Sequence, residues 1–291
     1  MHALIAQERK AFHKQLLDTE TLTLTADGIV SNADKSSKLS KQIAQEIIRL
    51  IGQNDGLDIC LTKKIAGQTL GKQFEFCVTG FLQKTFPFLS NLRPGYWKIF
   101  QLGNNNRLKT SDFAQYEHLA YLSRLTAADS QLAASLGNDY LIAPDIVIYR
   151  ELCEDSEINA NLEIVDQYTC TMADLRKANG GKPILHASIS AKFTMRSDRA
   201  QNSRTEALNL IRNRKGRVPH IAVVTAEPMP NRLASLALGT GDIDCVYHFA
   251  LYELEQSVHK FGSEDSVDLL KALISGRRLK DISDLPLDLA V

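Results

Sequence analysis

The sequence lacks several features that would place it in a special class of protein. No apolar run approaches the roughly 18 residues that a membrane span needs. The N-terminus does not have the charged-then-apolar order of a signal peptide. Cysteines are few, odd in number and never arranged as Cys-x-x-Cys, so a zinc site is not expected. We expect reduced, buried cysteines in a cytoplasmic protein that does not enter a membrane.

Net charge is also absent: the formal charge is zero, which argues against a protein that coats polyanions indiscriminately. The charge is nevertheless unevenly distributed. Residues 192–217 contain eight basic and two acidic residues, an excess of six positive charges over 26 residues. A solvated helix face is the simpler interpretation of such a run. A selective nucleic-acid enzyme is the alternative, because it needs a concentrated basic segment.

Internal repeats, low-complexity segments and Gly/Ser linkers are missing too, so we predict a single domain spanning residues 1–291. Within it, residues 1–140 are expected to be mainly helical and residues 261–291 to form a helical tail. The intervening core, 141–260, alternates strands with helices. Its expected strands are 143–150, 184–193, 219–226 and 243–248, and its expected helices are 201–213, 230–238 and 250–260. This alternation predicts an α/β fold with a mixed central sheet flanked by helices.

Three earlier elements are also expected. Residues 40–52 form an amphipathic helix that ends at a glycine, residues 69–84 form a second helix, and residues 96–103 form a strand. The second helix should bury one apolar side, which consists of Phe74, Cys77, Val78, Phe81 and Leu82. A long helical region is expected over 112–136. In the core, the nearly all-apolar run 219–226 is typical of a fully buried central strand.

Polar residues on two of the core strands suggest a chemical site. Alternation along a strand puts Ser188, Ser190 and Lys192 on one face, whereas Ile189, Ala191 and Phe193 face a core. Asp145 follows a proline at the start of the strand expected over 143–150, and Glu206 lies on the helix expected over 201–213. Two acids with a Ser-x-Lys strand are a plausible set for metal-assisted phosphodiester hydrolysis, because carboxylates hold a hard cation and an ammonium meets phosphate or water.

Each of these residues also has a simpler explanation. Asp145 could merely end a strand, and Glu206 could be an ordinary helix partner near Arg204. Glu75, on the helix 69–84, could lie on the wet side of that helix. Lys192 is harder to explain in this way, because a lysine flanked by apolar residues is costly to bury without a charged partner or ligand.

The residues after Lys192 are suited to reading bases. Arginine donates two parallel hydrogen bonds to guanine, and a carboxylate accepts one from the amine of cytosine. The cluster Arg196-Ser-Asp198-Arg199 at a helix N-terminus therefore suits adjacent C·G pairs read in the major groove. A second interpretation is that Ser197 or Asp198 caps the helix beginning near residue 200. Both can hold at once.

Taken together, Pro144-Asp145, Ser190-Ala-Lys192 and Glu206 resemble the variant PD-(D/E)xK active site of the CCGG family of type II restriction endonucleases. In that variant the second acid lies on the helix that follows the Ser-x-Lys strand. Further segments resemble a tetrameric member of the family that cuts GCCGGC, and they are 196–202, 213–217, 237–241 and 280–291. The resemblance covers nearly the whole chain, is strongest over 138–291, and implies a restriction-endonuclease-like core with catalytic and DNA-reading residues in 141–260.

The resemblance implies two Mg²⁺ ions per active site. Asp145 would be their shared ligand, Glu206 a second metal-site acid, and the carbonyl of Ala191 a further ligand. Lys192 would orient or help to deprotonate the attacking water, and Ser190 would bind indirectly through water or a hydrogen bond. Ala191 stands where the related enzyme has a cysteine, and a backbone role predicts no loss of activity.

Other residues receive roles by the same resemblance. Glu75 matches an acid close to the metals, and Arg196 and Arg199 would take the guanines while Asp198 takes the cytosines. Gln68 would probe the central pairs from the minor groove. The outer pair would be read by Asp34, Ser36 and Arg232.

The sequence therefore predicts a type II restriction endonuclease that hydrolyses double-stranded DNA with Mg²⁺. Its target would contain CCGG, as GCCGGC cut after the first G to leave a 5′-CCGG overhang. A palindromic site needs a homodimer, and the resemblance adds assembly to a homotetramer, with the loop 227–231 as a candidate link. A cognate DNA methyltransferase would belong to the same system without direct contact. The alternatives are a repair or junction-resolving nuclease without base specificity, and a catalytically silent, sequence-specific DNA-binding protein.

Overall fold

The computed structural model describes residues 3–59, 61, 67–102, 107–136, 144–195, 197–239 and 241–291. For residues 67, 68, 107–109 and 197–200 it describes the backbone alone. In the described part of the chain, no helix is long and apolar enough to span a membrane.

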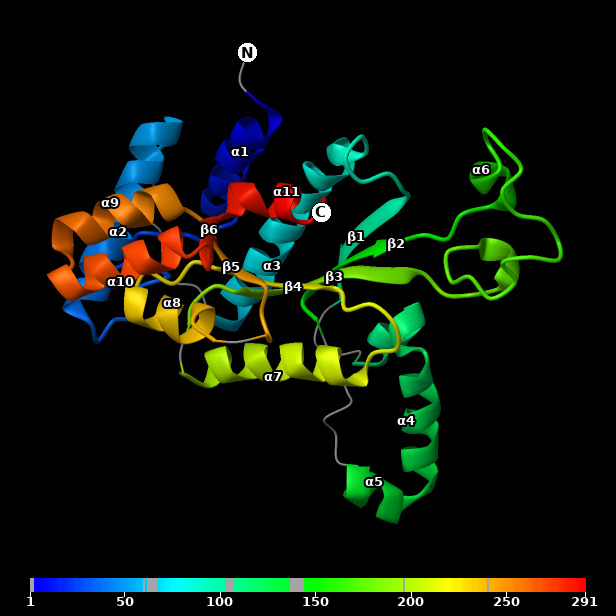
Figure 1. Cartoon of the computed structure of the whole chain (residues 1–291). Coiled ribbons are helices and arrows are strands. Elements are labelled where there is room, and N and C mark those ends of the chain that lie inside the picture. The colour runs from blue at the N-terminus through cyan, green and yellow to red at the C-terminus, as the bar shows by residue number, and fades with distance from the viewer. Residues whose placement is uncertain are drawn as a thin grey trace. The chain divides into compact units, whose positions relative to one another are not determined.

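Six strands of the described chain form one sheet in the order β1-β2-β3-β4-β5-β6 (Figure 1). Their bounds are β1 Trp97–Gln101, β2 Ile146–Arg150, β3 Ile184–Lys192, β4 His220–Thr225, β5 Cys245–His248 and β6 Leu279–Asp281. β1 and β2 are antiparallel, with Ile99 opposite Ile148. β4 and β5 are parallel, as are β5 and β6. The predicted α/β fold with a mixed central sheet is confirmed.

Helices make up most of the remaining described structure. The α-helices are α1 Leu4–Asp18, α2 Lys38–Asp55, α3 Gly67–Gln83, α4 His118–Ala128, α5 Ser130–Leu136, α6 Asp155–Ile158, α7 Ser197–Asn213, α8 Pro230–Ala237, α9 Leu251–Phe261, α10 Glu264–Ser275 and α11 Leu285–Asp288. Short 3₁₀ turns are η1 Phe86–Leu89, η2 Arg107–Asp112, η3 Ala114–Tyr116, η4 Lys177–Asn179 and η5 Ile282–Asp284.

The chain divides into two compact units, and β3 and α7 contribute residues to both. The first unit comprises 1–93, 189–204 and 221–291. In it α2 packs on α9, α1 on α3 and α8 on α10. α2 begins at Ser37, whose hydroxyl accepts the Ser40 N–H at 3.2 Å. It ends at Gly56, whose φ of +63° is the left-handed conformation that glycine adopts without strain.

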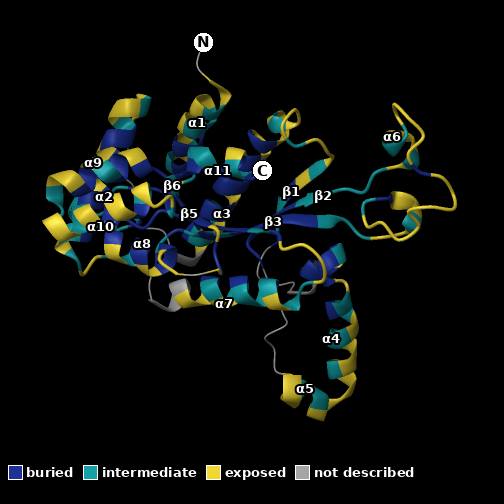
Figure 2. Ribbon diagram, in the orientation of Figure 1, coloured by how far each residue is buried: buried dark blue, intermediate teal, exposed yellow. Residues whose placement is uncertain are grey.

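The core of the first unit lies where the sequence predicted apolar surfaces. All five residues of the apolar side of α3 are at most 2% exposed, as predicted. β4 is buried from Ile221 to Thr225, and it is dark blue in Figure 2. The predicted central strand is therefore confirmed. The burial of such runs is the main source of stabilisation for this unit.

The second unit comprises 94–188 and 205–220. The amide of Gln115 fastens the η3 turn to β3, donating to the Leu185 carbonyl at 2.7 Å and accepting the Leu185 N–H at 3.0 Å. The Tyr116 hydroxyl donates to the Leu210 carbonyl at 3.0 Å. The segment between β2 and β3 is held by Arg176, whose guanidinium donates to the Asp155 carboxylate at 2.7 Å and to two carbonyls.

Several local predictions need correction. The helix expected over 40–52 continues to residue 55, so Gly52 is inside it and Gly56 ends it. The region 112–136 is divided into η3, α4 and α5. The tail 261–291 is not purely helical, because it contains β6. The single domain over residues 1–291 stays a prediction.

One expectation about burial also fails. Cys77 and Cys245 are buried and unpaired, but Cys170 is exposed and Cys153 is half-buried. The loop 227–231 as a link between copies stays a prediction: Asn231 is exposed, whereas Glu227, Pro228 and Pro230 are buried.

Candidate functional site

Asp145 lies directly before β2 in the second unit. The residue is only 2% exposed, and its backbone carbonyl accepts the Leu102 N–H at 2.9 Å. Ile146, Val147 and Ile148, which follow it, are completely buried. A carboxylate is costly to bury without a cation or hydrogen bonds, so this position is more than a solvated end of a strand. The strand expected over 143–150 begins at Ile146, so Asp145 lies just before it.

The end of β3 carries the Ser-x-Lys residues in the first unit. Ser190 and Lys192 are half-buried, whereas Ile189, Ala191 and Phe193 are at most 4% exposed. The predicted alternation therefore holds at this end of the strand. Two residues earlier, Ser188 is only 5% exposed, so the predicted polar face is not open to solvent at that position. The Ser190 hydroxyl lies 3.4 Å from that of Ser203, which is buried on α7.

The two remaining acids lie on helices, one in each unit. Glu206 is half-buried on α7 in the second unit. Glu75 is on α3 in the first unit and is 9% exposed. The neighbouring residue that faces solvent on α3 is instead Phe76, which is 56% exposed. The simple explanation of Glu75 as a solvated residue is therefore wrong.

The inner base readers are only partly within the described structure. Arg196 lies outside the described residues. Asp198 and Arg199 lie in the first turn of α7, and Gln68 lies in the first turn of α3, but their side chains are outside the described part. The backbone agrees with the helix N-terminus that the sequence predicted for the arginine cluster, although α7 begins at Ser197 instead of near residue 200.

The three proposed outer-pair readers, in contrast, come together in the first unit. A guanidinium nitrogen of Arg232 donates to the Asp34 carboxylate. The Ser36 hydroxyl and N–H also donate to that carboxylate, at 2.6 and 3.0 Å. The bonds from Ser36 and Arg232 hold the pKa of Asp34 well below its usual range. Despite the opposing effect of burial, Asp34 and Glu227 raise the pKa of Arg232. The side chains are therefore a charged pair at neutral pH.

A buried acid that the sequence did not single out lies against this pair. Glu227 is 1% exposed, and its carboxylate is 3.6 Å from the Arg232 guanidinium. Its only sequence signal is its position, two residues beyond the buried strand β4.

The basic segment 192–217 divides into structural and exposed residues. The Arg204 guanidinium donates to Asp242 at 2.9 Å and to the carbonyls that end α8, among them that of Leu238 at 2.6 Å. Arg204 therefore stabilises the first unit. Lys215 and Arg217 are exposed and are better placed to contact a polyanion.

The donor set fits a magnesium site. Among the described residues, no group of three or more His, Cys, Asp or Glu side chains lies close enough to hold a metal. Mg²⁺ does not need such a cage, since it is commonly held by one or two carboxylates, waters and substrate phosphates. The buried Asp145 carboxylate and the Glu206 carboxylate are the ligand type that this ion prefers.

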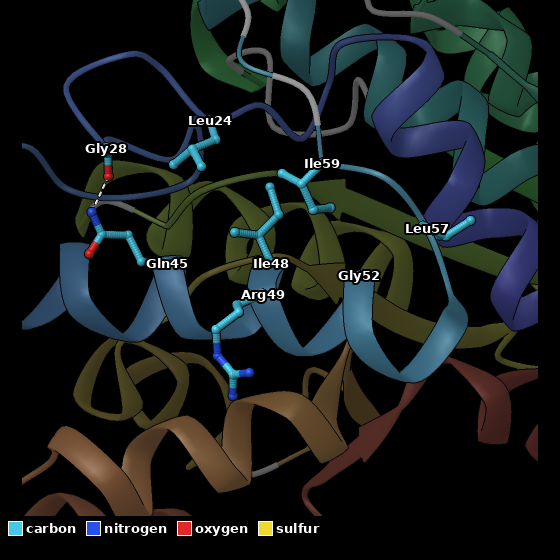
Figure 3. A pocket seen from close by; sticks show the side chains of 8 residues that line it. All are labelled: Leu24, Gly28, Gln45, Ile48, Arg49, Gly52, Leu57 and Ile59. Carbon is cyan, nitrogen blue, oxygen red and sulfur yellow. Dashed lines mark hydrogen bonds between the residues drawn. The ribbon is translucent and has the colours of Figure 1, made fainter.

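A separate hollow of about 420 Å³ lies on α2 in the first unit (Figure 3). Its lining is mainly apolar, with Ile48 on its floor and the Gln45 amide donating to the Gly28 carbonyl at its rim. None of the residues predicted for the site lines it. The hollow is therefore not a candidate for the chemistry considered above.

An acid before one strand, Ser-x-Lys at the end of the neighbouring strand and an acid on the next helix are typical of PD-(D/E)xK nucleases. Comparison with known proteins identifies the particular family. A family model described as "NgoMIV restriction enzyme" matches residues 12–291. The type II restriction enzyme NgoMIV of Neisseria gonorrhoeae is 52% identical over 291 residues, which is all of this chain and all of that protein. The chain belongs to the NgoMIV restriction enzyme family and is a type II restriction endonuclease.

Two solved structures are more distant. The restriction endonuclease Bse634I with cognate DNA is 16% identical, with a TM-score of 0.35 over 87% of this chain and 92% of that one. The PspGI–substrate DNA complex is 14% identical, with a TM-score of 0.25 over 99% of this chain and 92% of that one. At these scores the likeness adds nothing to the family assignment.

Proposed function

We propose that this restriction endonuclease hydrolyses double-stranded DNA at the palindrome GCCGGC in the presence of Mg²⁺. It would cut after the first G and leave a 5′-CCGG overhang. The observation that carries the target is the convergence of Asp34, Ser36 and Arg232 in one unit. The family resemblance matches all three residues to the reading of one outer base pair. An arginine and a carboxylate are the groups that recognise guanine and cytosine.

The catalytic residues would have three roles: binding of the metal ions, orientation of the attacking water, and binding of a further water. Asp145 and Glu206 would hold two Mg²⁺ ions, with the Ala191 carbonyl completing a metal shell and Glu75 close by. Bound metal supplies charge stabilisation at the phosphate and lowers the pKa of water. Lys192 would orient the attacking water or take part in its deprotonation, while Ser190 holds a water by hydrogen bond. Water attacks phosphorus, the bond to the 3′ oxygen breaks, and a 5′-phosphate remains.

Base recognition would come from two sets of residues. Arg196 and Arg199 would bind the guanines and Asp198 the cytosines of CCGG, with Gln68 probing the central pairs from the minor groove. Asp34, Ser36 and Arg232 would read the outer pair. A nuclease without base specificity would need neither set. A silent DNA-binding protein would not need the metal-site acids.

Cleavage of a plasmid of known sequence in Mg²⁺, followed by sequencing of the fragment ends, tests the target. Ends at GCCGGC are expected, and ends at unrelated sequences would contradict the proposal.

Asp145→Ala should abolish cleavage while specific binding in Ca²⁺ remains, because the acid positions ions and not bases. Asp18→Asn is the control, since Asp18 is an exposed acid that pairs with the exposed Lys14. A cleavage rate of Asp145→Ala within about tenfold of wild type would show that Asp145 is not a metal ligand required for catalysis.

A homodimer that assembles to a homotetramer is also part of the proposal. It is supported by large apolar side chains that are 62 to 90% exposed on the segment between β2 and β3, namely Leu162, Ile164, Tyr168 and Met172. Exposed apolar residues in such number favour association. Sedimentation should give a tetramer, and a two-site plasmid should be cut faster than a one-site plasmid. A dimer with equal rates would contradict the tetramer and leave the nuclease proposal intact.

Two further parts of the proposal concern cellular context. The enzyme would act in the cytoplasm, where DNA is accessible. A cognate methyltransferase would protect the same site without contacting this chain.

A further inference from the structure

The buried acid Glu227 lies between two segments that the proposed function uses for base reading. It follows β4 in the first unit and is 1% exposed. One carboxylate oxygen accepts the backbone N–H of Met195 at 2.8 Å. The other accepts the Met229 N–H at 3.2 Å and faces the Arg232 guanidinium at 3.6 Å. A single buried side chain therefore contacts three positions in two separate parts of the chain.

Two of the three contacts, those to Met195 and Arg232, lead directly to a proposed base reader. Met195 is the residue immediately before Arg196, and α7 with the inner-pair residues begins two residues after it. Arg232, on α8, is the proposed outer-pair arginine and also binds Asp34. The turn itself is fastened to the loop that carries Asp34, because the buried Asn32 amide donates to the Ala226 carbonyl at 2.8 Å. The His248 imidazole lies 3.2 Å from the Glu227 carbonyl and immobilises the turn from β5.

We infer that Glu227 is a positioning residue for sequence recognition. It fixes the position of the inner-pair segment after Met195 relative to the outer-pair arginine Arg232. The inference rests on the proposed function. A buried carboxylate is costly unless its oxygens accept hydrogen bonds or face a cation. Displacing either reader would leave part of this carboxylate without its partners. The two readers are therefore coupled through Glu227, although it contacts no base itself.

The test compares wild type with Glu227→Ala and Glu227→Gln on three duplexes. These are the wild-type target found by end sequencing, the same duplex with its outer pair changed, and the same duplex with one inner pair changed. The ratio of kcat/KM on the target to that on each altered duplex measures discrimination. Glu253→Gln is the matched control, since Glu253 is also a buried acid that faces an arginine: it is 2% exposed and lies 2.6 Å from Arg9.

Glu227→Ala should lower discrimination at both the outer and the inner pair, each by about tenfold, the lower range of one base contact. Glu227→Gln keeps one acceptor for the Met195 N–H but removes the charge that faces Arg232. It should therefore lower discrimination at the outer pair and preserve it at the inner pair. Arg232→Ala should affect the outer pair alone, and the Glu253→Gln control should keep both ratios.

Unchanged ratios in Glu227→Gln and in any folded Glu227→Ala protein, even with lower overall rates, would overturn the inference and leave a purely structural role. If Glu227→Ala does not fold, the outer-pair discrimination of Glu227→Gln tests the inference: a lower ratio supports it, and an unchanged ratio overturns it. The wild-type enzyme tests the proposed function on its own. If it cuts DNA without sequence preference, the proposed function is contradicted before any variant is compared.

Discussion

Replacing Glu227 by glutamine should change how the stability of this protein depends on pH. Burial raises the pKa of the Glu227 carboxyl from the ordinary 4.5 to about 7. The Met195 and Met229 N–H groups and the Arg232 guanidinium favour the ionised form and oppose burial. Burial outweighs these partners because the side chain is 1% exposed. Glutamine has nearly the same shape and carries no titrating proton.

The sign follows from proton linkage. A carboxyl whose pKa is higher in the folded protein contributes stability that is present below pH 4.5, its ordinary pKa, and is lost as pH rises through about 7. Wild type should therefore lose stability relative to Glu227→Gln as pH rises. The difference between the two pKa values corresponds to about 3 kcal/mol over the whole range, of which about 2.5 kcal/mol falls between pH 5 and 8.

Urea unfolding of both proteins at several pH values from 5 to 8 measures this change. The curve of Glu227→Gln minus wild type should rise with pH. His248, whose pKa burial lowers to about 4, also affects stability in this window, but it is present in both proteins and cancels in the difference. Glu253→Gln is the control: burial opposes ionisation of Glu253, but the hydrogen bonds and charge of Arg9, with smaller contributions from other groups, outweigh it and lower the pKa. The effect of this substitution should therefore be nearly constant above pH 5.

Parallel stability profiles for wild type and Glu227→Gln would refute the reasoning. They would mean that the Glu227 carboxylate stays ionised throughout this window. The hydrogen bonds and the guanidinium would then outweigh burial.

Three further predictions concern other parts of the molecule. Lys215→Ala and Arg217→Ala should weaken binding to all duplexes alike in Ca²⁺ and reduce the salt dependence by about one counterion each, as measured by fluorescence anisotropy. A loss confined to the target would identify them as base readers. Arg9→Ala should lower the free energy of unfolding by about 3–5 kcal/mol, because it leaves buried carboxylates, including that of Glu253, without their cation; an unchanged urea midpoint would contradict this. Cys170, which is exposed, should react with a thiol reagent in the native protein, whereas the buried Cys77 and Cys245 should react only after unfolding.

The sequence by itself determined the elements whose residues carry a local periodicity. The apolar run of β4, the apolar side of α3 and the alternation at the end of β3 were predictable, because one face or the whole element must leave water. Asp145 before β2 was predictable because it follows a proline and precedes an apolar strand, and the N-terminus of α7 because Ser197 and Asp198 are capping residues. β6 was not, since three residues are too few to show a period.

Tertiary structure alone decided which polar residues meet. Asp34 and Arg232 are 198 positions apart, and no local preference of either residue encodes their ion pair. The family resemblance assigned them a common role, but only the folded chain brings them together and places the buried Glu227 against Arg232. Likewise, Ser188 and Ser190 are equivalent in the strand pattern, yet the folded protein buries the first and leaves the second half-open. Burial at a given position depends on what the rest of the chain packs over it, and that is settled by long-range contacts and not by the period of a strand.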